Sequence, residues 1–117
     1  MDVQNYQDLI AWQKAMTMVT EIYELTKQFP SDERFGLTSQ IRRAAVSIPS
    51  TIAEGHARNS TGEFIQFLGI ARGSLAEVNT QLLIAKNLRY VESIEMQLDA
   101  AAEVGRILNG LMKSLKE

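Results

Sequence analysis

The chain contains no cysteine, a single histidine and only two prolines among its 117 residues. The absence of cysteine excludes a disulfide scaffold, a thiolate-ligated zinc or iron–sulfur site and a cysteine nucleophile. With one histidine, His56 alone would have to carry any histidine-dependent chemistry. No apolar run approaches the roughly 18–20 residues that span a bilayer, so we expect no membrane association.

Sequence motifs of catalysis are missing as well. There is no Walker loop, no Gly-x-Ser-x-Gly elbow and no zinc-protease motif. A di-iron bundle needs Glu-x-x-His pairs, but Ala53 stands three residues before His56. A helical ribonuclease motif consists of an arginine, four to six further residues and then a histidine. For His56, the arginine would stand at position 49, 50 or 51, and these positions hold Pro49, Ser50 and Thr51. Methionines at helical spacing are more often core residues than haem ligands. We therefore predict no enzyme, no metal and no cofactor.

The composition is that of one globular domain covering residues 1–117. Hydrophobic residues make up 45% of the chain, which is too many for an intrinsically disordered protein, and the length is too short for two cores. The segment Met1–Asn5 lacks the basic-then-apolar order of an export signal. Together with the absence of cysteine, this predicts a cytoplasmic location.

Charge is unevenly distributed along the chain. The net charge is −2, which argues against a simple polybasic nucleic-acid binder. Residues 1–33 carry −4, residues 34–89 carry +4 and residues 90–117 carry −2. The basic middle segment forms either a local positive surface or a set of charges that pair with the acidic ends.

Apolar residues recur at helical spacing along almost the whole chain. Residues 8–29 predict a helix that stops at Phe29-Pro30, because the residue before proline disfavours the helical conformation. Residues 31–33 predict a solvated turn. Two neighbouring stripes run along this first helix. The stripe assigned to the core is Leu9, Trp12, Met16, Val19, Tyr23 and Thr26, and the second is Ala11, Ala15, Met18, Ile22, Leu25 and Phe29.

A second helix is predicted from about Gly36 to Arg58. Pro49 lies inside it and removes one hydrogen bond, which predicts a kink, with a break into two short helices as the alternative. Its core line is Leu37, Ile41, Ala44, Ile48 and Ile52.

Two further helices follow. Ser60 and Glu63 have the spacing of a capping box, and Ser93 is a candidate N-cap for the last helix. The predicted core line of the third helix is Phe64, Leu68, Ala71, Leu75, Val78, Leu82 and Ala85, and that of the fourth is Ile94, Leu98, Ala101, Gly105, Leu108, Met112 and Leu115. No segment alternates with a period of two. The fold expected is therefore an all-α, antiparallel up-down-up-down four-helix bundle.

Apolar surface exceeds what one bundle core uses, and soluble monomers rarely expose large apolar patches. The surplus includes the second stripe of residues 8–29 and Val104, Ile107 and Leu111. We therefore expect a homo-oligomer. The candidate interface residues are Ile65, Gly69, Ile70, Gly73, Leu83, Ile84 and Glu54. The two glycines allow close approach either of another subunit or of a helix in the same chain.

A polar line runs along the second predicted helix, opposite its core line. Its members are Arg43, Ser47, Ser50 and Glu54. Arg42 lies between this line and the core. The line faces a neighbouring subunit, a central channel or solvent. Glu54 and Glu77 are candidate ion-pair partners for Arg43 and Arg72.

The same segments carry a resemblance to a known family. The matching segments are Leu9–Gln13, Phe29–Pro30, Phe35–Leu37, Gln40–Ser50, Ile52–Gly55 and Gly73–Leu75 with Glu77. In this order they resemble the bacterial four-helix-bundle proteins encoded in intervening sequences of 23S ribosomal RNA genes, over roughly residues 6–91. The chain departs from the family pattern at Thr51, where asparagine is usual, and at His56, where an aromatic residue is common.

The resemblance implies a homopentamer of antiparallel bundles, but the family has no settled molecular function. It is similar to the accessory protein of diversity-generating retroelements, which implies a reverse transcriptase-like partner and a basic surface suited to nucleic acid. Two functions follow. The first is a non-enzymatic protein that binds RNA or DNA through Arg42, Arg43, Arg58 and Arg72. The second is a protein-interaction scaffold in which these arginines are structural.

Overall fold

The computed structural model describes residues 5–117, and these form four long helices with no strand. The helices are α1 (Ile10–Thr26), α2 (Leu37–His56), α3 (Thr61–Asn87) and α4 (Glu95–Lys116), with two short 3-10 helices, η1 (Tyr6–Asp8) and η2 (Ser31–Glu33). The predicted all-helical fold with four helices is confirmed. Part of the segment inspected for an export signal, residues 1–4, lies outside the described residues.

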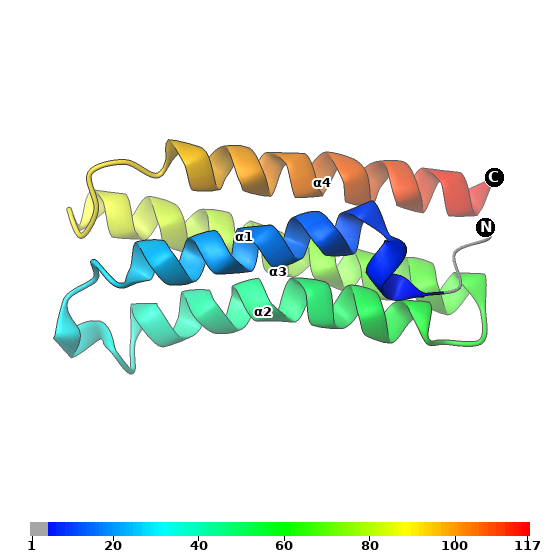
Figure 1. The fold of residues 1–117 in the computed structure, drawn as a ribbon, viewed down its shortest axis with the longest axis horizontal. Coiled ribbons are helices and arrows are strands. Elements are labelled where there is room, and N and C mark those ends of the chain that lie inside the picture. The colour runs from blue at the N-terminus through cyan, green and yellow to red at the C-terminus, as the bar shows by residue number, and fades with distance from the viewer. Residues whose placement is uncertain (1–4) are drawn as a thin grey trace.

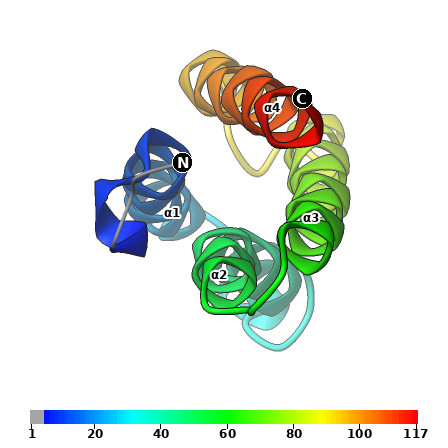
Figure 2. The same ribbon diagram turned by 90° about the vertical axis from the view of Figure 1, so that its right-hand side faces the viewer.

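The four helices lie lengthwise in an elongated molecule of 44 × 23 × 19 Å, and the loops that join them lie at alternate ends (Figure 1). Viewed end-on, the helices form a ring in the order α1, α2, α3, α4 (Figure 2). Each helix packs against its two neighbours in the ring, and the α2–α3 pair has the most extensive contact. The core therefore fills the centre of the ring.

The predicted core lines of α2 and α3 are confirmed. All five residues of the α2 line and all seven of the α3 line are buried, among them Ile48, Leu68 and Leu82, which have no exposed surface. The polar line of α2 faces away from this core, with Arg43 and Glu54 exposed. Helical spacing alone is sufficient to orient these two helices.

The prediction for α1 chose the wrong stripe as the core. The second stripe is buried in full, from Ala11 to Phe29. Of the first stripe only Leu9 and Thr26 are buried, whereas Met16 and Tyr23 are exposed. Both stripes are apolar, but the second fits the centre of the ring because its small residues, Ala11 and Ala15, allow close packing there. On α4, Val104 is buried instead of belonging to surplus surface.

Caps define where the helices begin. The Ser60 hydroxyl accepts a hydrogen bond from the Glu63 backbone N–H at 3.1 Å, which confirms the predicted start of α3. The expected cap of α4 is wrong by one residue: Ile94 is the N-cap, and Ser93 accepts a longer bond of 3.4 Å from the Glu95 N–H. Ile94 takes this position because its side chain is buried in the core.

The turn between α1 and α2 is more than a solvated connection. Regular helix ends at Thr26, and the Phe29 N–H then bonds to the Thr26 carbonyl in a tighter turn before Pro30. Glu33 accepts hydrogen bonds from the Leu37 N–H at 3.0 Å and from the Tyr90 hydroxyl at 2.6 Å. The Leu37 bond first, and the Tyr90 bond second, hold the pKa of Glu33 below its ordinary value. This turn is thereby tied to the α3–α4 loop.

Helix α2 continues without interruption through Pro49, so the alternative of two short helices is wrong. Near its end, Gly55 allows the closest approach between α2 and α3. A Cβ atom at this position would lie 2.5 Å from Cβ of Phe67. Glycine is therefore required here by packing between the two helices.

Candidate nucleic-acid interface

Arg42 is committed to a contact within the chain. Its Nε donates to the Thr26 hydroxyl at 2.7 Å, and its second terminal nitrogen donates to the Tyr23 carbonyl at 3.3 Å. The guanidinium also lies 4.5 Å from the centre of the Tyr23 ring. A cation here favourably meets the last carbonyls of α1. Arg42 therefore joins α2 to the end of α1 and does not project toward a ligand.

Glu54 lies on α2, and Arg58 follows the end of this helix one turn later; the two side chains contact each other. Their side chains approach to 3.5 Å, and the Arg58 guanidinium lies 4.8 Å from the centre of the Phe67 ring. Both side chains are substantially exposed, so this ion pair contributes little stability and can open. Glu54, predicted as an interface residue and as a partner for Arg43 or Arg72, thus has its partner within its own chain.

Arg72 joins α3 to α4. It donates to the Asn109 side-chain oxygen at 2.9 Å. Because Asn109 is neutral, the charge of Arg72 is not compensated by this contact. Arg72 lies on the α4 side of α3, whereas Arg42 lies on the α1 side of α2, so the structure does not gather the four predicted arginines into one patch.

Arg43 is the exception among the four. Its side chain is exposed. Within residues 5–117, no carboxylate lies within 4 Å of the guanidinium, and the guanidinium donates no hydrogen bond. It lines a groove between α2 and α3, which we call the α2–α3 groove. The other residues that line it are Phe35, Ser39, Gln40, Ala44, Ser47, Ser74, Glu77 and Gln81. Arg43 and Glu77 are thus brought to one groove without forming an ion pair.

Three groups in or beside this groove were missed by sequence reasoning. The Phe35 side chain is 88% exposed, and the Arg34 guanidinium lies 5.2 Å from the centre of its ring. Gln81 is nine-tenths buried, and its Oε1 has no hydrogen-bond partner among the described residues. The available signal was the position of Gln81, which shares the core register of Val78 and Ala85 although glutamine is polar.

The predicted interface residues on α3 differ in exposure. Ile70, Leu83 and Ile84 are 56%, 50% and 41% exposed, whereas Ile65 and Gly69 are half-buried. A Cβ added at Gly73 would have no atom within 4 Å, so Gly73 makes no close contact inside the chain. At Gly69 the nearest atom is Cε of Met112, at 3.9 Å. These residues form what we call the outer face of α3.

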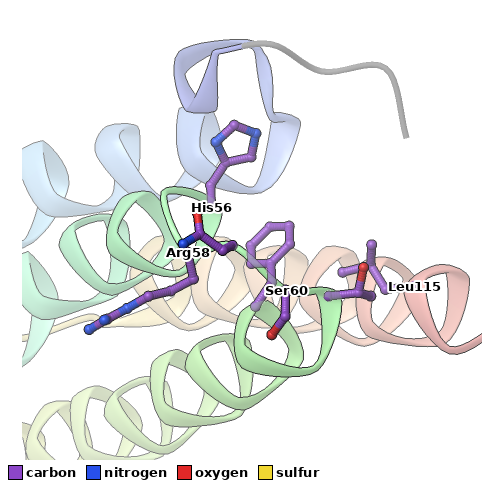
Figure 3. A pocket seen from close by; sticks show the side chains of 7 residues that line it. His56, Arg58, Ser60 and Leu115 are labelled. Atoms are coloured by element: carbon purple, nitrogen blue, oxygen red, sulfur yellow. The ribbon is translucent and has the colours of Figure 1, made fainter.

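A second pocket lies where α2 ends and α3 begins (Figure 3). His56, Arg58, Ser60 and Leu115 come from the end of α2, the following loop and α4, and the His56 ring meets the Phe64 ring edge-on at 5.7 Å. Within residues 5–117 no group of three or more metal-ligating side chains is gathered here or elsewhere. Nor does that part of the chain contain a helix long and apolar enough to cross a membrane.

The protein is a small four-helix bundle, and its described residues include no recognisable set of catalytic side chains. Comparison with known proteins places it further. Residues 7–110 match the 23S rRNA-intervening sequence protein family, and the chain belongs to this family. The match includes α4 up to Gly110, which the resemblance seen in the sequence did not reach.

A solved structure has the same fold. It is the crystal structure of a protein with unknown function from the S23 ribosomal protein family of Bacteroides thetaiotaomicron, with 24% sequence identity and a TM-score of 0.81. The alignment covers 89% of this chain and 96% of that one. A comparison with curated proteins gives no match. The family match therefore establishes the relationship, and the solved structure, whose own function is unknown, establishes the fold.

Proposed function

We propose that this chain is a non-enzymatic, homo-oligomeric bundle protein that associates with RNA through the α2–α3 groove. The observation that carries the proposal is Arg43, an exposed guanidinium with no acidic partner among the described residues. Arg34 adds a second cation beside Phe35 at the start of α2. Arginine is well suited to phosphate because its planar group donates two parallel hydrogen bonds.

The outer face of α3 supports a homo-oligomer. It combines three exposed large apolar side chains with Gly73, where an added Cβ would meet no atom of the described residues within 4 Å. The resemblance to the family implies five subunits. A ring of identical subunits would repeat each modest RNA contact and raise the overall affinity through avidity. Repetition of the groove thus compensates for the small number of cations in each one.

We also propose three features of the protein that the sequence leads us to expect. These are the antiparallel order of the helices, a kink of α2 at Pro49 and a cytoplasmic location. Loops at alternate ends of the molecule support the antiparallel order (Figure 1), and the presence of Pro49 inside α2 supports the kink.

The test is the affinity of a fluorescently labelled single-stranded RNA, measured by anisotropy at several salt concentrations. Affinity should fall steeply with salt because phosphate contacts release counterions. Arg43→Ala should weaken binding several-fold and reduce the salt dependence. The matched control is Arg106→Ala, which removes the same charge from an exposed position on α4, a helix that does not pack against α2. Absence of salt-dependent binding, or equal loss in both variants, would contradict the proposal.

A protein-interaction scaffold is the second candidate, and one observation favours it. The groove between α1 and α2 is lined almost entirely by apolar side chains, including Trp12, Val19 and Pro49, with Met16 and Val46 exposed at its edge. A reverse transcriptase-like partner, which the family resemblance implies, would cover such a surface. Purification with a stoichiometric protein partner and without nucleic acid would favour this function over RNA binding.

A further inference from the structure

We propose that the α2–α3 groove binds one unpaired guanine of an RNA strand, stacked on Phe35 and recognised by Gln81 and Glu77. This inference rests on the proposed function and adds the kind of nucleotide that the groove selects. It is carried by three features of the groove: an exposed aromatic ring, a buried acceptor without a partner and a carboxylate one turn away from it.

The aromatic ring is Phe35. At 88% exposed, it is the most exposed large apolar side chain among the described residues. The guanidinium of the adjoining Arg34 lies 5.2 Å from the centre of its ring. Apolar burial therefore does not explain a phenylalanine at this position. Stacking on an aromatic ring is the usual way in which proteins hold bases of single-stranded RNA, and a neighbouring arginine strengthens it. A base paired within a duplex has no free face for such a ring.

The buried acceptor is Oε1 of Gln81. It has no hydrogen-bond partner in the described chain, and a buried polar atom left unpaired is costly. The oxygen itself is covered, but Gln81 lines the groove, so a rotation of its side chain toward the groove brings the oxygen to a ligand donor, and the new hydrogen bond removes this cost. Glu77 precedes Gln81 by four residues on α3 and lines the same groove, so the two side chains leave the helix one turn apart on the same side.

When the Gln81 and Glu77 side chains converge on one base, their two acceptors select guanine among the four RNA bases. The Watson–Crick edge of guanine presents two adjacent donors, the ring N1–H and the exocyclic amino group. Adenine and cytosine each present one amino donor beside a ring acceptor, and uracil presents one N–H between two carbonyls. A carboxylate repels these carbonyl and ring acceptors. Arg43, at the exposed side of the groove, is then placed for the phosphate of the bound nucleotide.

The experiment compares labelled RNA ten-mers by anisotropy: oligouridine with one central G, A or C, and a hairpin with the same G base-paired. The wild-type chain should bind the G strand about tenfold more tightly than the A strand, as expected for one well-made pair of hydrogen bonds. Phe35→Ala should weaken binding to the G strand about tenfold and leave hairpin binding unchanged, since stacking contributes only to the unpaired base. Ile10→Ala, at a 60% exposed position on α1, is the matched control and should change neither.

Two variants test the recognition of the base edge. Gln81→Met keeps the volume of a buried side chain and should reduce the preference for G over A to near unity. Glu77→Gln should also lower the preference, while raising the affinity for oligouridine because a negative charge near the phosphates is removed. Far-ultraviolet circular dichroism and solution mass, recorded for each variant, show that the fold and the assembly are unchanged.

The outcomes separate this inference from the function on which it rests. Salt-dependent RNA binding that is equal for G, A and C strands, or equal for strand and hairpin, overturns the guanine site and leaves the proposed function standing. Loss of solution mass in Phe35→Ala, with RNA affinity retained, overturns it too, because Phe35 would then be an interface residue. Absence of binding to every RNA overturns both.

Discussion

The two faces of α3 differ in what explains them. Its inner face consists of apolar residues that are all buried against the rest of the bundle, as Leu68 and Leu82 illustrate. Its outer face has exposed Ile70, Leu83 and Ile84, and a Cβ added at Gly73 on this face would meet no atom of the described residues within 4 Å. Packing within one chain explains the apolar residues of the first face, but it does not explain the exposed Ile70, Leu83 and Ile84 of the second.

This difference is what our proposal explains by a second contact surface on α3. A solvated helix face usually carries charged and polar residues, and large apolar residues there mark contact surfaces. Glycine in a helix interior is destabilising relative to alanine unless close approach requires it. Since no atom of residues 5–117 outside its own helix lies within 4 Å of a Cβ position at Gly73, a second copy of the chain is the partner that our proposal assigns to this face.

The largest effect is expected from a pair of neighbouring leucines that lie on opposite faces. Leu82→Ala should lower the free energy of unfolding by about 2–5 kcal/mol, because it leaves a cavity in the core. Leu83→Ala, at a 50% exposed position, should change it by no more than about 0.5 kcal/mol and should lower the solution mass. Urea denaturation of both variants measures the first quantity. Equal losses of stability would remove the distinction between the faces.

Two glycines give the next comparison. Gly55→Ala should destabilise the chain by about 1–2 kcal/mol, because the new Cβ would lie 2.5 Å from Cβ of Phe67 and this clash exceeds the gain in helix propensity. Gly73→Ala has open space and should stabilise the chain by up to about 1 kcal/mol. In the assembly, the same Gly73→Ala change should weaken contact between subunits. Thermal melting and solution mass together test this, and a stabilised variant of unchanged mass would count against the interface.

Adjacent arginines on α2 sharpen the comparison for polar residues. Arg42→Ala should cost about 1 kcal/mol of stability, because the Thr26 hydroxyl and the Tyr23 carbonyl lose a charged donor. Arg43→Ala should leave stability unchanged and weaken RNA binding. Denaturation curves and anisotropy of the two purified variants decide this. If Arg43→Ala lowered the stability and Arg42→Ala did not, the contacts of Arg42 would not be those that hold α1 to α2.

The smallest effect concerns the bond between Glu33 and Tyr90, which ties two loops together over one end of the bundle. The pKa of Glu33 is lowered in the folded chain, so its carboxylate contributes stability above the ordinary carboxyl pKa of 4.5 and loses it as pH falls through the lowered value. Glu33→Gln should therefore lower the melting temperature by a few degrees at neutral pH, and the difference should shrink in acid. A difference that is constant from neutral to acid pH would contradict the ionic character of this contact.

Much of the fold follows from residue spacing, and the exceptions have physical causes. The core line of α2 was predictable because a polar line lies opposite it, and that of α3 because its apolar residues keep a regular four-three spacing from Phe64 to Ala85. For α1 two apolar stripes lie side by side, and only the position of its neighbours decides that Ala15, not Met16, faces inward. The cap of α4 was misplaced because burial of Ile94 outweighs the capping preference of Ser93.

The candidate site was less predictable than the fold. Sequence reasoning identified Arg43 together with three other arginines. Only tertiary contacts show that Arg42 and Arg72 have partners in the chain, whereas Arg58 pairs locally with Glu54, one helical turn away. The groove brings Gln81 of α3 to residues of α2 that are more than thirty positions away, a proximity that no local motif encodes.

The most direct test is the solution mass of the wild-type chain, measured by light scattering after size exclusion with absorbance recorded at 260 and 280 nm. We predict a mass near five times 13.1 kDa, about 66 kDa, and a raised 260/280 ratio that a salt wash removes. A single peak at 13.1 kDa would contradict the central claim, because the outer face of α3 would then have no second copy to cover it.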